Sequence, residues 1–177
     1  RTSWGAAHRQ WLRSIQFEHE GEKTVFDDYL FAVEQLEERL KALEAALEAQ
    51  AQREPYRERV GWLMCFRGIK VVTAMTILAE LHGFERFTKP RELMGYLGLV
   101  PSEYSSAEQT RRGGITKTGN QHARRMLVEC AWNYRSKPAI RQTLRQRRAG
   151  QPAWVISIAD KAQQRLSVWQ IKDGEPP

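Results

Sequence analysis

Residues 26–47 read FDDYLFAVEQLEERLKALEAAL. In this segment, which we call the 26–47 seam, apolar side chains recur at alternating spacings of three and four residues. This is the a/d pattern of a heptad repeat, kept over about three heptads, with glutamate, lysine and arginine at other positions. Strong helix formers continue toward Pro55, which ends the helical pattern. The seam therefore predicts one long helix. Its apolar positions are Phe26, Tyr29, Val33, Leu36, Leu40, Leu43 and Leu47.

The narrowness of the 26–47 seam suggests what it packs against. A strict a/d stripe is narrower than the apolar face of an ordinary globular helix. We therefore expect the seam to join copies of the chain as a homo-oligomeric coiled coil. The alternative is a long helix that packs on its own domain, which three heptads do not exclude. If assembly were the main role of the seam, the chain would be a coiled-coil oligomerisation adaptor.

Helical patterns recur along most of the remaining chain, and no segment reads as a β-strand. We therefore expect an all-α fold, with a helix-hairpin-helix-like domain over residues 55–177 and a helical, coiled-coil segment over residues 1–54. A chain of 177 residues is long enough for one domain with a core plus an extension. The further predicted helices cover residues 6–15, 56–65, 71–81, 90–97, 121–135, 138–148 and 152–166.

The turn between the helices 56–65 and 71–81 reads FRGIK, residues 66–70. A glycine-bearing turn between two helices resembles a helix-hairpin-helix, which offers backbone N–H groups to a DNA phosphate. Lys70 stands where such turns usually have a second glycine, and a lysine also suits a phosphate. Arg67, Gly68 and Lys70 are therefore candidate DNA-binding residues. An ordinary corner between two helices is the alternative.

Charge is distributed unevenly along the chain. Residues 101–150 carry eleven lysines and arginines against three acidic residues, whereas residues 1–60 carry nine against twelve. A clustered excess of cations is typical of proteins that bind a polyanion, most often nucleic acid. The alternative is a basic surface that serves solubility. No apolar run approaches the roughly 18 residues that span a membrane, so we expect no membrane partner.

The cysteine and histidine residues point to packing rather than to metal binding. Cys65 and Cys130 both lie in apolar helical runs without CxxC spacing, which favours core positions in a reducing compartment. The four histidines are scattered, and no pair has the spacing of metal ligands. We therefore expect neither a disulfide nor a metal site in this segment.

Residues 99–125 read LVPSEYSSAEQTRRGGITKTGNQHARR. From residue 99 to residue 119 the sequence shows neither a helical period nor a clean alternation, so we expect a long loop between two packed helices. Long loops of this kind are usually functional or disordered. The segment combines adjacent hydroxyls at Ser105 and Ser106 with several cations, which suits phosphate chemistry. The candidate nucleic-acid contacts are Arg111, Arg112, Lys117, Gly119, Asn120, Arg124 and Arg125.

The paired serines raise the question of nucleophilic chemistry. A serine hydroxyl is a weak nucleophile unless a base removes its proton and cations stabilise the charge that builds on the phosphate. The nearby candidate bases are Glu103, Glu108 and His122. Most serines in loops serve only as polar surface or turn caps. Metal-dependent nuclease chemistry has less support, because few carboxylates follow residue 100.

Two segments carry a family resemblance: RELMGYLGLVPSEYSS at 91–106 and RRGGITKTGNQHARRMLVECAWNYR at 111–135. Together they closely resemble the carboxy-terminal domain of the "IS one-ten" family of insertion-sequence transposases, the bridge-RNA-guided DNA recombinases. Residues 66–87 are similar to the hairpin region of the same domain. Residues 4–40 are similar to the preceding segment, which in the family includes a coiled coil. The resemblance thus covers nearly the whole chain.

The resemblance implies a serine nucleophile. In the family, a serine in a Tyr/His-Ser-Ser-Gly stretch attacks a DNA phosphodiester and becomes linked to it. On this chain the motif reads Tyr104-Ser105-Ser106-Ala107, which assigns the role to Ser105, with Ser106 as the alternative. Ala107 stands where the family usually has glycine. A non-catalytic helix-hairpin-helix DNA-binding module remains the rival interpretation.

The resemblance also implies partners. Family proteins carry an amino-terminal RNase-H-like (RuvC-type) domain whose carboxylates bind Mg²⁺, and because this chain opens on Arg1 we expect it to be part of a longer protein. We expect no cofactor in this segment itself, because the resemblance assigns Mg²⁺ to the RNase-H-like domain. The expected partners are DNA, a structured guide (bridge) RNA and further copies of the chain. The expected location is the bacterial cytoplasm, in association with the nucleoid.

Overall fold

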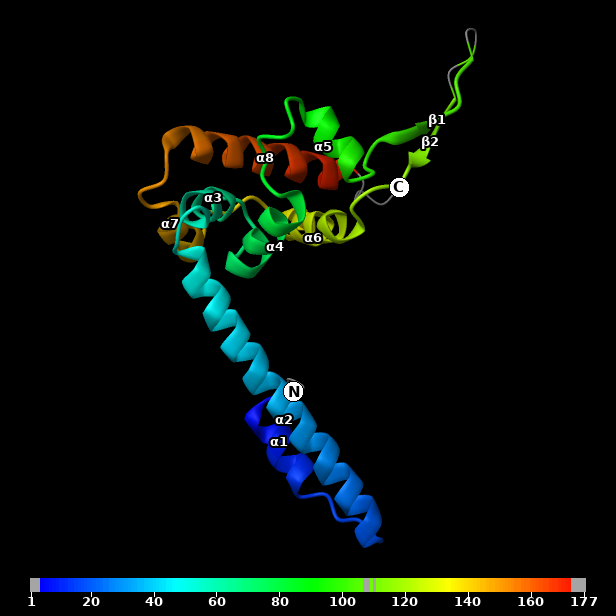
Figure 1. Ribbon diagram of the computed structural model, residues 1–177, viewed down its shortest axis with the longest axis vertical. Helices are drawn as coiled ribbons and strands as arrows, with labels where there is room; N and C mark the ends of the chain where they lie inside the picture. Colours follow the sequence, from blue (N-terminus) through cyan, green and yellow to red (C-terminus); the bar gives the residue numbers. More distant parts are fainter. Residues whose placement is uncertain (1–3, 107–108, 110, 173–177) are drawn as a thin grey trace. The chain divides into compact units, whose positions relative to one another are not determined.

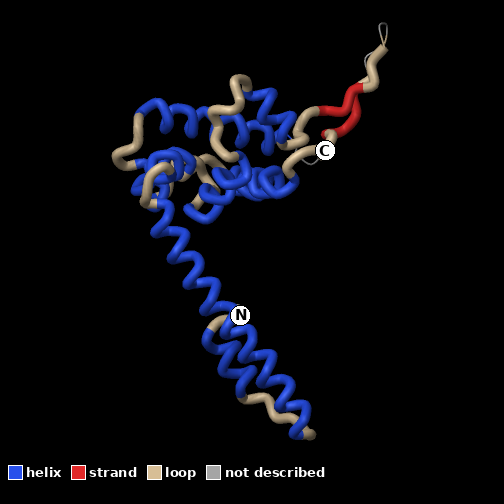
Figure 2. Tube along the Cα trace, in the orientation of Figure 1, coloured by secondary structure: helices blue, strands red, loops and turns tan. Residues whose placement is uncertain are grey.

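A computed structural model describes residues 4–106, 109 and 111–172. The described residues are mostly helical, as predicted, with one small antiparallel sheet (Figures 1 and 2). The chain divides into two compact units, Arg1–Ala45 and Ala46–Pro177, and the boundary predicted between residues 54 and 55 stays a prediction. The elements are α1 (Ala6–Arg13), α2 (Glu20–Ala51), α3 (Tyr56–Leu63), α4 (Val71–Leu81), α5 (Pro90–Tyr96), β1 (Pro101–Glu103), β2 (Arg112–Ile115), α6 (Gln121–Ala131), the 3₁₀ helix η1 (Trp132–Arg135), α7 (Gln142–Arg148) and α8 (Ala153–Lys172).

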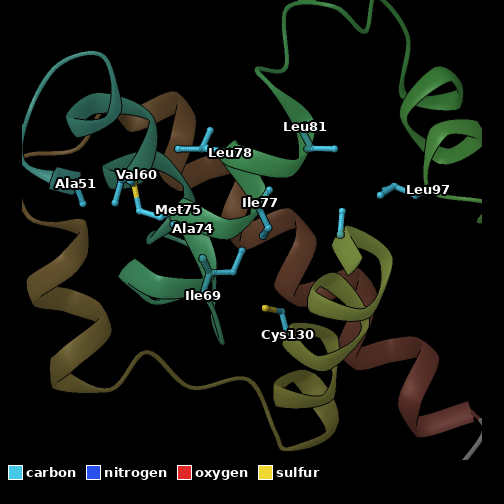
Figure 3. Packing of buried hydrophobic residues seen from close by; sticks show 11 residues of the cluster. Ala51, Val60, Ile69, Ala74, Met75, Ile77, Leu78, Leu81, Leu97 and Cys130 are labelled. Carbon is cyan, nitrogen blue, oxygen red and sulfur yellow. The ribbon is translucent and has the colours of Figure 1, made fainter. Parts of the chain in front are cut away.

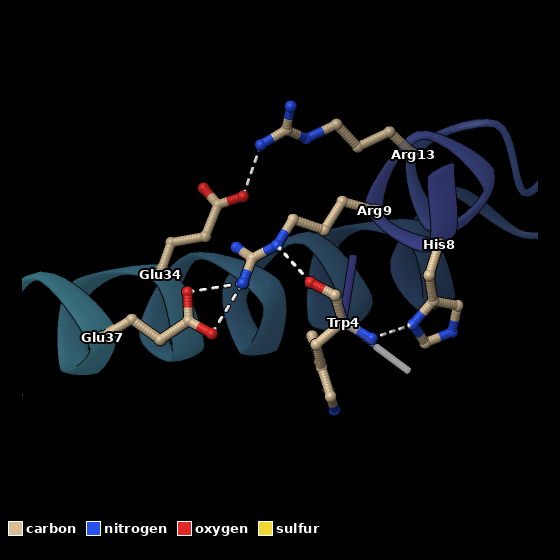
Figure 4. Close-up of polar contacts among 6 residues, drawn as sticks. All are labelled: Trp4, His8, Arg9, Arg13, Glu34 and Glu37. Atoms are coloured by element: carbon tan, nitrogen blue, oxygen red, sulfur yellow. Dashed lines mark hydrogen bonds and ion pairs between the residues drawn. The ribbon is translucent and has the colours of Figure 1, made fainter. Parts of the chain in front are cut away.

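In the first unit, α1 folds back along α2. The guanidinium of Arg9 donates two hydrogen bonds of 2.6 Å to the carboxylate of Glu37, and Arg13 pairs with Glu34 (Figure 4). The hydrogen bonds from Arg9 lower the pKa of Glu37. Because such pairs are solvated, each adds little stability. Their main effect is to fix which side of α2 is covered by α1.

The long helix predicted from the 26–47 seam is confirmed, since α2 runs from Glu20 to Ala51. Phe26, Val33 and Leu47 are half-buried. Leu47 itself belongs to the second unit, and it packs against the core of that unit. Pairing of the seam with another copy stays a prediction. The apolar seam residues that α1 leaves exposed are Tyr29 (70% exposed), Leu36 (64%), Leu40 (55%) and Leu43 (58%).

The core of the second unit is built around α4 (Figure 3). Its sequence, VVTAMTILAEL, is apolar on most of its circumference, and Ala74, Met75, Ile77, Leu78 and Leu81 are all buried. A helix that is apolar nearly all round is stable only inside a core. Helices α3 and α6, the end of α2, the turn 66–70 and the residue that follows α5 contribute the remaining buried residues of this cluster. These are Ala51, Val60, Ile69, Leu97, Ala123 and Cys130.

Both cysteines occupy core positions, as their apolar surroundings predicted. Cys65 and Cys130 are buried and carry no disulfide, and burial raises the pKa of both thiols. Cys65 belongs to a second cluster with Val155 and Ala159, through which α8 packs on the unit. Both thiols therefore contribute to packing.

The structure corrects three sequence-based expectations. Residues 99–119 were expected to be a loop, but they include the antiparallel pair β1–β2. The helix expected over 121–135 ends at Ala131 and continues as η1. The helix expected from Pro138 begins only at Gln142, because Arg67 holds the carbonyls of Ser136 and Lys137 outside any helix. No described helix has both the length and the apolar character needed to cross a membrane.

Candidate functional site

The segment that carries the paired serines forms a β-hairpin that projects from the helices of its unit (Figure 1). Pro101 pairs with Ile115 and Glu103 with Arg112, with an irregular register between the two pairs. Beyond the strands, the Tyr104 N–H donates to the Arg111 carbonyl at 2.9 Å. Both strands are exposed except at Ser102, which is half-buried. Backbone hydrogen bonds between the two arms of the hairpin hold it together.

Near the tip, Ser105 and Ser106 occupy different positions. The Ser105 hydroxyl donates a hydrogen bond of 2.7 Å to Oε1 of Glu103. The Ser106 backbone instead exchanges hydrogen bonds with Gln109, at 2.9 and 3.3 Å. The side chain of Ser105 is therefore the one that contacts a candidate base. Both serines are exposed, so a large anionic substrate can reach them.

The other candidate bases differ from Glu103 in their placement. His122 Nδ1 lies 2.6 Å from Oε1 of Glu80 on α4, so its ring is paired with a carboxylate other than Glu103. Glu108, like Ala107 of the family-like motif, lies outside the described residues. Of the described candidates, Glu103 alone contacts Ser105.

The base of the hairpin is locked to the helices by close backbone contacts. The Lys117 N–H donates to the Gly98 carbonyl at 3.0 Å and the Thr116 N–H to the Val100 carbonyl at 2.9 Å. Gly98 and Gly119 both have positive φ, of 65° and 95°, where L side chains are strained. A Cβ on Gly119 would collide with the Tyr96 carbonyl. These contacts hold the hairpin on a rigid frame.

Asn120, predicted as the N-cap of the following helix, takes that position. Its Oδ1 accepts a hydrogen bond of 2.8 Å from the Ala123 N–H, which satisfies one of the donors left open at the start of α6. Its Nδ2 donates to Glu80 at 2.8 Å. The hydrogen bonds from Asn120 and then His122 lower the pKa of Glu80. Asn120 therefore ties α6, α4 and the hairpin together, so the structure gives it a positioning role.

The candidate cations fall into two groups. Arg111, Arg112 and Lys117 are exposed on the hairpin and its base. Nε of Arg112 lies 3.9 Å from Oε2 of Glu103, so the two side chains form only a weak ion pair. Arg124, by contrast, donates at 2.8 Å to the Leu97 carbonyl, and Arg125 pairs with Glu129 at 2.8 Å. The hairpin cations are therefore more available to an anion than those of α6.

The turn 66–70 is partly occupied by contacts within the chain. The Arg67 N–H donates to the buried Tyr134 hydroxyl at 3.0 Å. A Cβ on Gly68, whose φ is 87°, would lie 2.7 Å from the Cys130 carbonyl, so glycine is required for close packing against α6. Lys70 remains exposed. The N–H group of Arg67 is thus already used, and only Lys70 presents its side chain to solvent.

Within the described residues, no three His, Cys, Asp or Glu side chains lie close enough to share an ion.

Comparison with known proteins places this hairpin in a family context. Residues 61–145, from α3 through the hairpin and α6 into α7, match the model of the "Transposase IS116/IS110/IS902 family". The matched range includes the whole serine-bearing hairpin and the helices that hold its base. The chain belongs to the IS116/IS110/IS902 transposase family. This is the family that the 91–106 and 111–135 motifs resemble.

Individual members of the transposase family match along most of the chain. The transposase for insertion sequence element IS1533 of Leptospira borgpetersenii is 34% identical over 164 residues, covering 92% of this chain and 47% of that protein. The putative transposase y4qE of Sinorhizobium fredii is 36% identical over 165 residues, covering 93% and 39%. A probable family 20 transposase of Pseudomonas aeruginosa is 28% identical over 148 residues, covering 79% and 42%. The chain thus spans under half the length of these relatives.

One residue of this transposase-family site was missed by sequence reasoning. Glu80 accepts hydrogen bonds from Asn120 and His122, and the Tyr96 hydroxyl donates to its backbone carbonyl at 3.2 Å. The available signal was a lone carboxylate near the end of the apolar helix VVTAMTILAEL. Such a residue needs a polar partner because burial of an unpaired charge is costly.

Proposed function

We propose that this chain is the DNA-binding, serine-bearing part of a transposase and that Ser105 is its nucleophile. The observation that carries the proposal is the 2.7 Å hydrogen bond from the Ser105 hydroxyl to Glu103, on an exposed hairpin that bears Arg112 at the start of β2 and Arg111 just before it. Membership of the IS116/IS110/IS902 transposase family supports the reaction class, which is DNA strand breakage and rejoining.

The proposed step is a transesterification at phosphorus. Oγ of Ser105 attacks the phosphorus of a DNA phosphodiester, and the bond from phosphorus to one deoxyribose oxygen breaks. The serine proton passes to the Glu103 carboxylate, and the departing deoxyribose oxygen takes a proton from solvent. Arg111 and Arg112 offset the negative charge that grows on the phosphate oxygens. The protein–DNA ester conserves the bond energy that rejoining requires, whereas hydrolysis would lose it.

DNA is the proposed substrate and partner. Arg111, Arg112 and Lys117 would contact its phosphates first, because they are exposed on the hairpin and its base. Arg124 and Arg125 would act mainly through the frame that holds the hairpin, since their side chains already contact Leu97 and Glu129. Gly119 and Asn120 would serve the same frame. Lys70 is the proposed contact from the turn 66–70.

The remaining parts of the reaction are proposed from the family resemblance. A guide RNA and an RNase-H-like domain with Mg²⁺ would act together with this segment, and that domain would lie outside residues 1–177. The exposed part of the 26–47 seam supports assembly of several copies. Recombination joins two DNA molecules, so more than one serine-bearing chain fits the task.

Strand exchange by serine variants tests the proposal. The assay uses the complete reading frame that encodes this chain, together with guide RNA, DNA and Mg²⁺. Ser105→Ala should abolish strand exchange while DNA binding stays nearly unchanged, because one hydroxyl contributes little to an affinity dominated by phosphate contacts. Glu103→Gln should slow exchange, because an amide cannot take up the serine proton.

Ser106→Ala is the matched control for that assay. It should have the milder effect, because Ser106 contacts Gln109 through its backbone, which the substitution leaves in place. Exchange by Ser105→Ala but not by Ser106→Ala would move the nucleophile by one residue. Exchange by both variants would refute the serine mechanism.

A further inference from the structure

Residues 130–159 contain no aspartate or glutamate. Arg147 and Arg148, at the end of α7, are turned inward: Arg147 donates to the Ile69 carbonyl, and Arg148 is buried and pairs with Asp160 at 2.7 Å. The other cations of this segment are exposed, and none takes part in an ion pair among the described residues. We call the exposed part of residues 132–145 the 132–145 surface. Its exposed cations are Arg135, Lys137, Arg141 and Arg145.

The backbone beneath the 132–145 surface is held in place. Tyr134 is buried and its hydroxyl accepts from the Arg67 N–H at 3.0 Å. The Arg67 guanidinium donates to the carbonyls of Ser136 and Lys137, at 3.2 and 3.0 Å. Leu144 anchors α7 in the interior. A partner of this surface therefore orders side chains only, which lowers the entropic cost of binding.

An aromatic ring lies beside one of these cations, Arg135. Trp132 is 59% exposed, and the guanidinium carbon of Arg135 lies 5.5 Å from its ring centroid. This stacking follows from the 3₁₀ helix, in which residues i and i+3 lie above one another. An exposed indole beside uncompensated cations is the combination on which unpaired bases stack while phosphates are neutralised.

We infer that the 132–145 surface binds a single strand of nucleic acid. Trp132 stacks on an unpaired base, Arg135 extends that stacking platform, and the remaining cations contact successive phosphates. A duplex would use the cations without the indole, because its bases are already stacked inside the helix. This site is separate from the hairpin and does not depend on the chemistry proposed for Ser105.

Binding of short oligothymidylate and oligouridylate to the chain, measured by fluorescence anisotropy, tests the inference. Trp132→Ala should weaken binding of both by about tenfold, and affinity for a duplex of the same length should change by less than about twofold. Lys137→Ala combined with Arg141→Ala should lower the salt slope on the single strand by about 0.7 per lost contact. These two side chains are exposed, so the double variant tests the surface even if Trp132→Ala unfolds.

Trp11 provides a matched control. It is 58% exposed, close to the 59% of Trp132, but its neighbouring arginines, Arg9 and Arg13, are paired with Glu37 and Glu34. Trp11→Ala should leave single-strand binding unchanged. The inference would be overturned if Trp132→Ala weakened binding of single strands and duplex equally, or if Trp11→Ala weakened single-strand binding as much as Trp132→Ala does. Binding of the chain to anionic phosphatidylglycerol vesicles but not to oligonucleotides would also overturn it.

Discussion

Three residues with positive φ shape the base of the serine-bearing hairpin. Gly98, Lys117 and Gly119 have φ values of 65°, 56° and 95°. Two of them are glycines, for which this conformation carries no steric cost. At Gly119 the backbone also passes so close to the Tyr96 carbonyl that no Cβ fits. The orientation of the hairpin therefore depends on the absence of a side chain at this position.

Alanine substitution of glycines measures that dependence. Gly119→Ala should lower the free energy of unfolding by about 1–2 kcal/mol for the left-handed backbone alone, with a further loss from the collision. Gly114→Ala is the matched control, because a Cβ on this glycine would meet nothing within 4 Å. Thermal unfolding would report both effects. Equal melting temperatures for the two variants would show that the hairpin base is not fixed in this way.

Individual residues differed in how far the sequence revealed their roles. Asn120 was identifiable as an N-cap because the cap preference is local, and its Oδ1 does bond to the Ala123 N–H. Glu80 was not identifiable, because its partners lie 40 and 42 residues away. The internal roles of Arg67 and Arg124 also depend on contacts with distant carbonyls. A cation that caps a carbonyl has the same sequence signature as one that binds phosphate.

At the scale of the element, α2 was the most predictable part of the chain. A heptad pattern specifies both the helix and its apolar stripe, and the helix is present. The β1–β2 hairpin was missed because its residues do not alternate: β2 reads RGGI and is exposed at every position. Its strands are specified by pairing across the tip, which is a tertiary property.

The exposed part of the 26–47 seam leads to a prediction about assembly. Leu36→Glu combined with Leu43→Glu should shift the chain toward the monomer, because each leucine buried between copies contributes about 1.5–3 kcal/mol. Gln35→Glu combined with Ala42→Glu is the matched control, since it adds the same charges at the same spacing beside the seam. Light scattering at tens of micromolar would measure the mass. A monomer for the unsubstituted chain would rule the prediction out.

At the scale of the whole molecule, charge separates the acidic N-terminal residues from the basic residues 101–150. DNA binding should therefore weaken steeply with salt. Arg111→Ala and Arg112→Ala should each reduce the log–log slope on duplex DNA by about 0.9. Arg125→Ala should change it less, because this side chain is already paired with Glu129. Equal slopes for all variants would place the phosphate contacts elsewhere.

The proposed mechanism requires that Ser105 forms a covalent bond to DNA. The most direct measurement is denaturing electrophoresis of end-labelled DNA after reaction with the protein from the complete reading frame, guide RNA and Mg²⁺, followed by mass spectrometry of the cross-linked peptide. We expect a protein–DNA adduct that maps to Ser105, disappears in Ser105→Ala and persists in Ser106→Ala. Recombination without any adduct, or an adduct that maps to another residue, would contradict it.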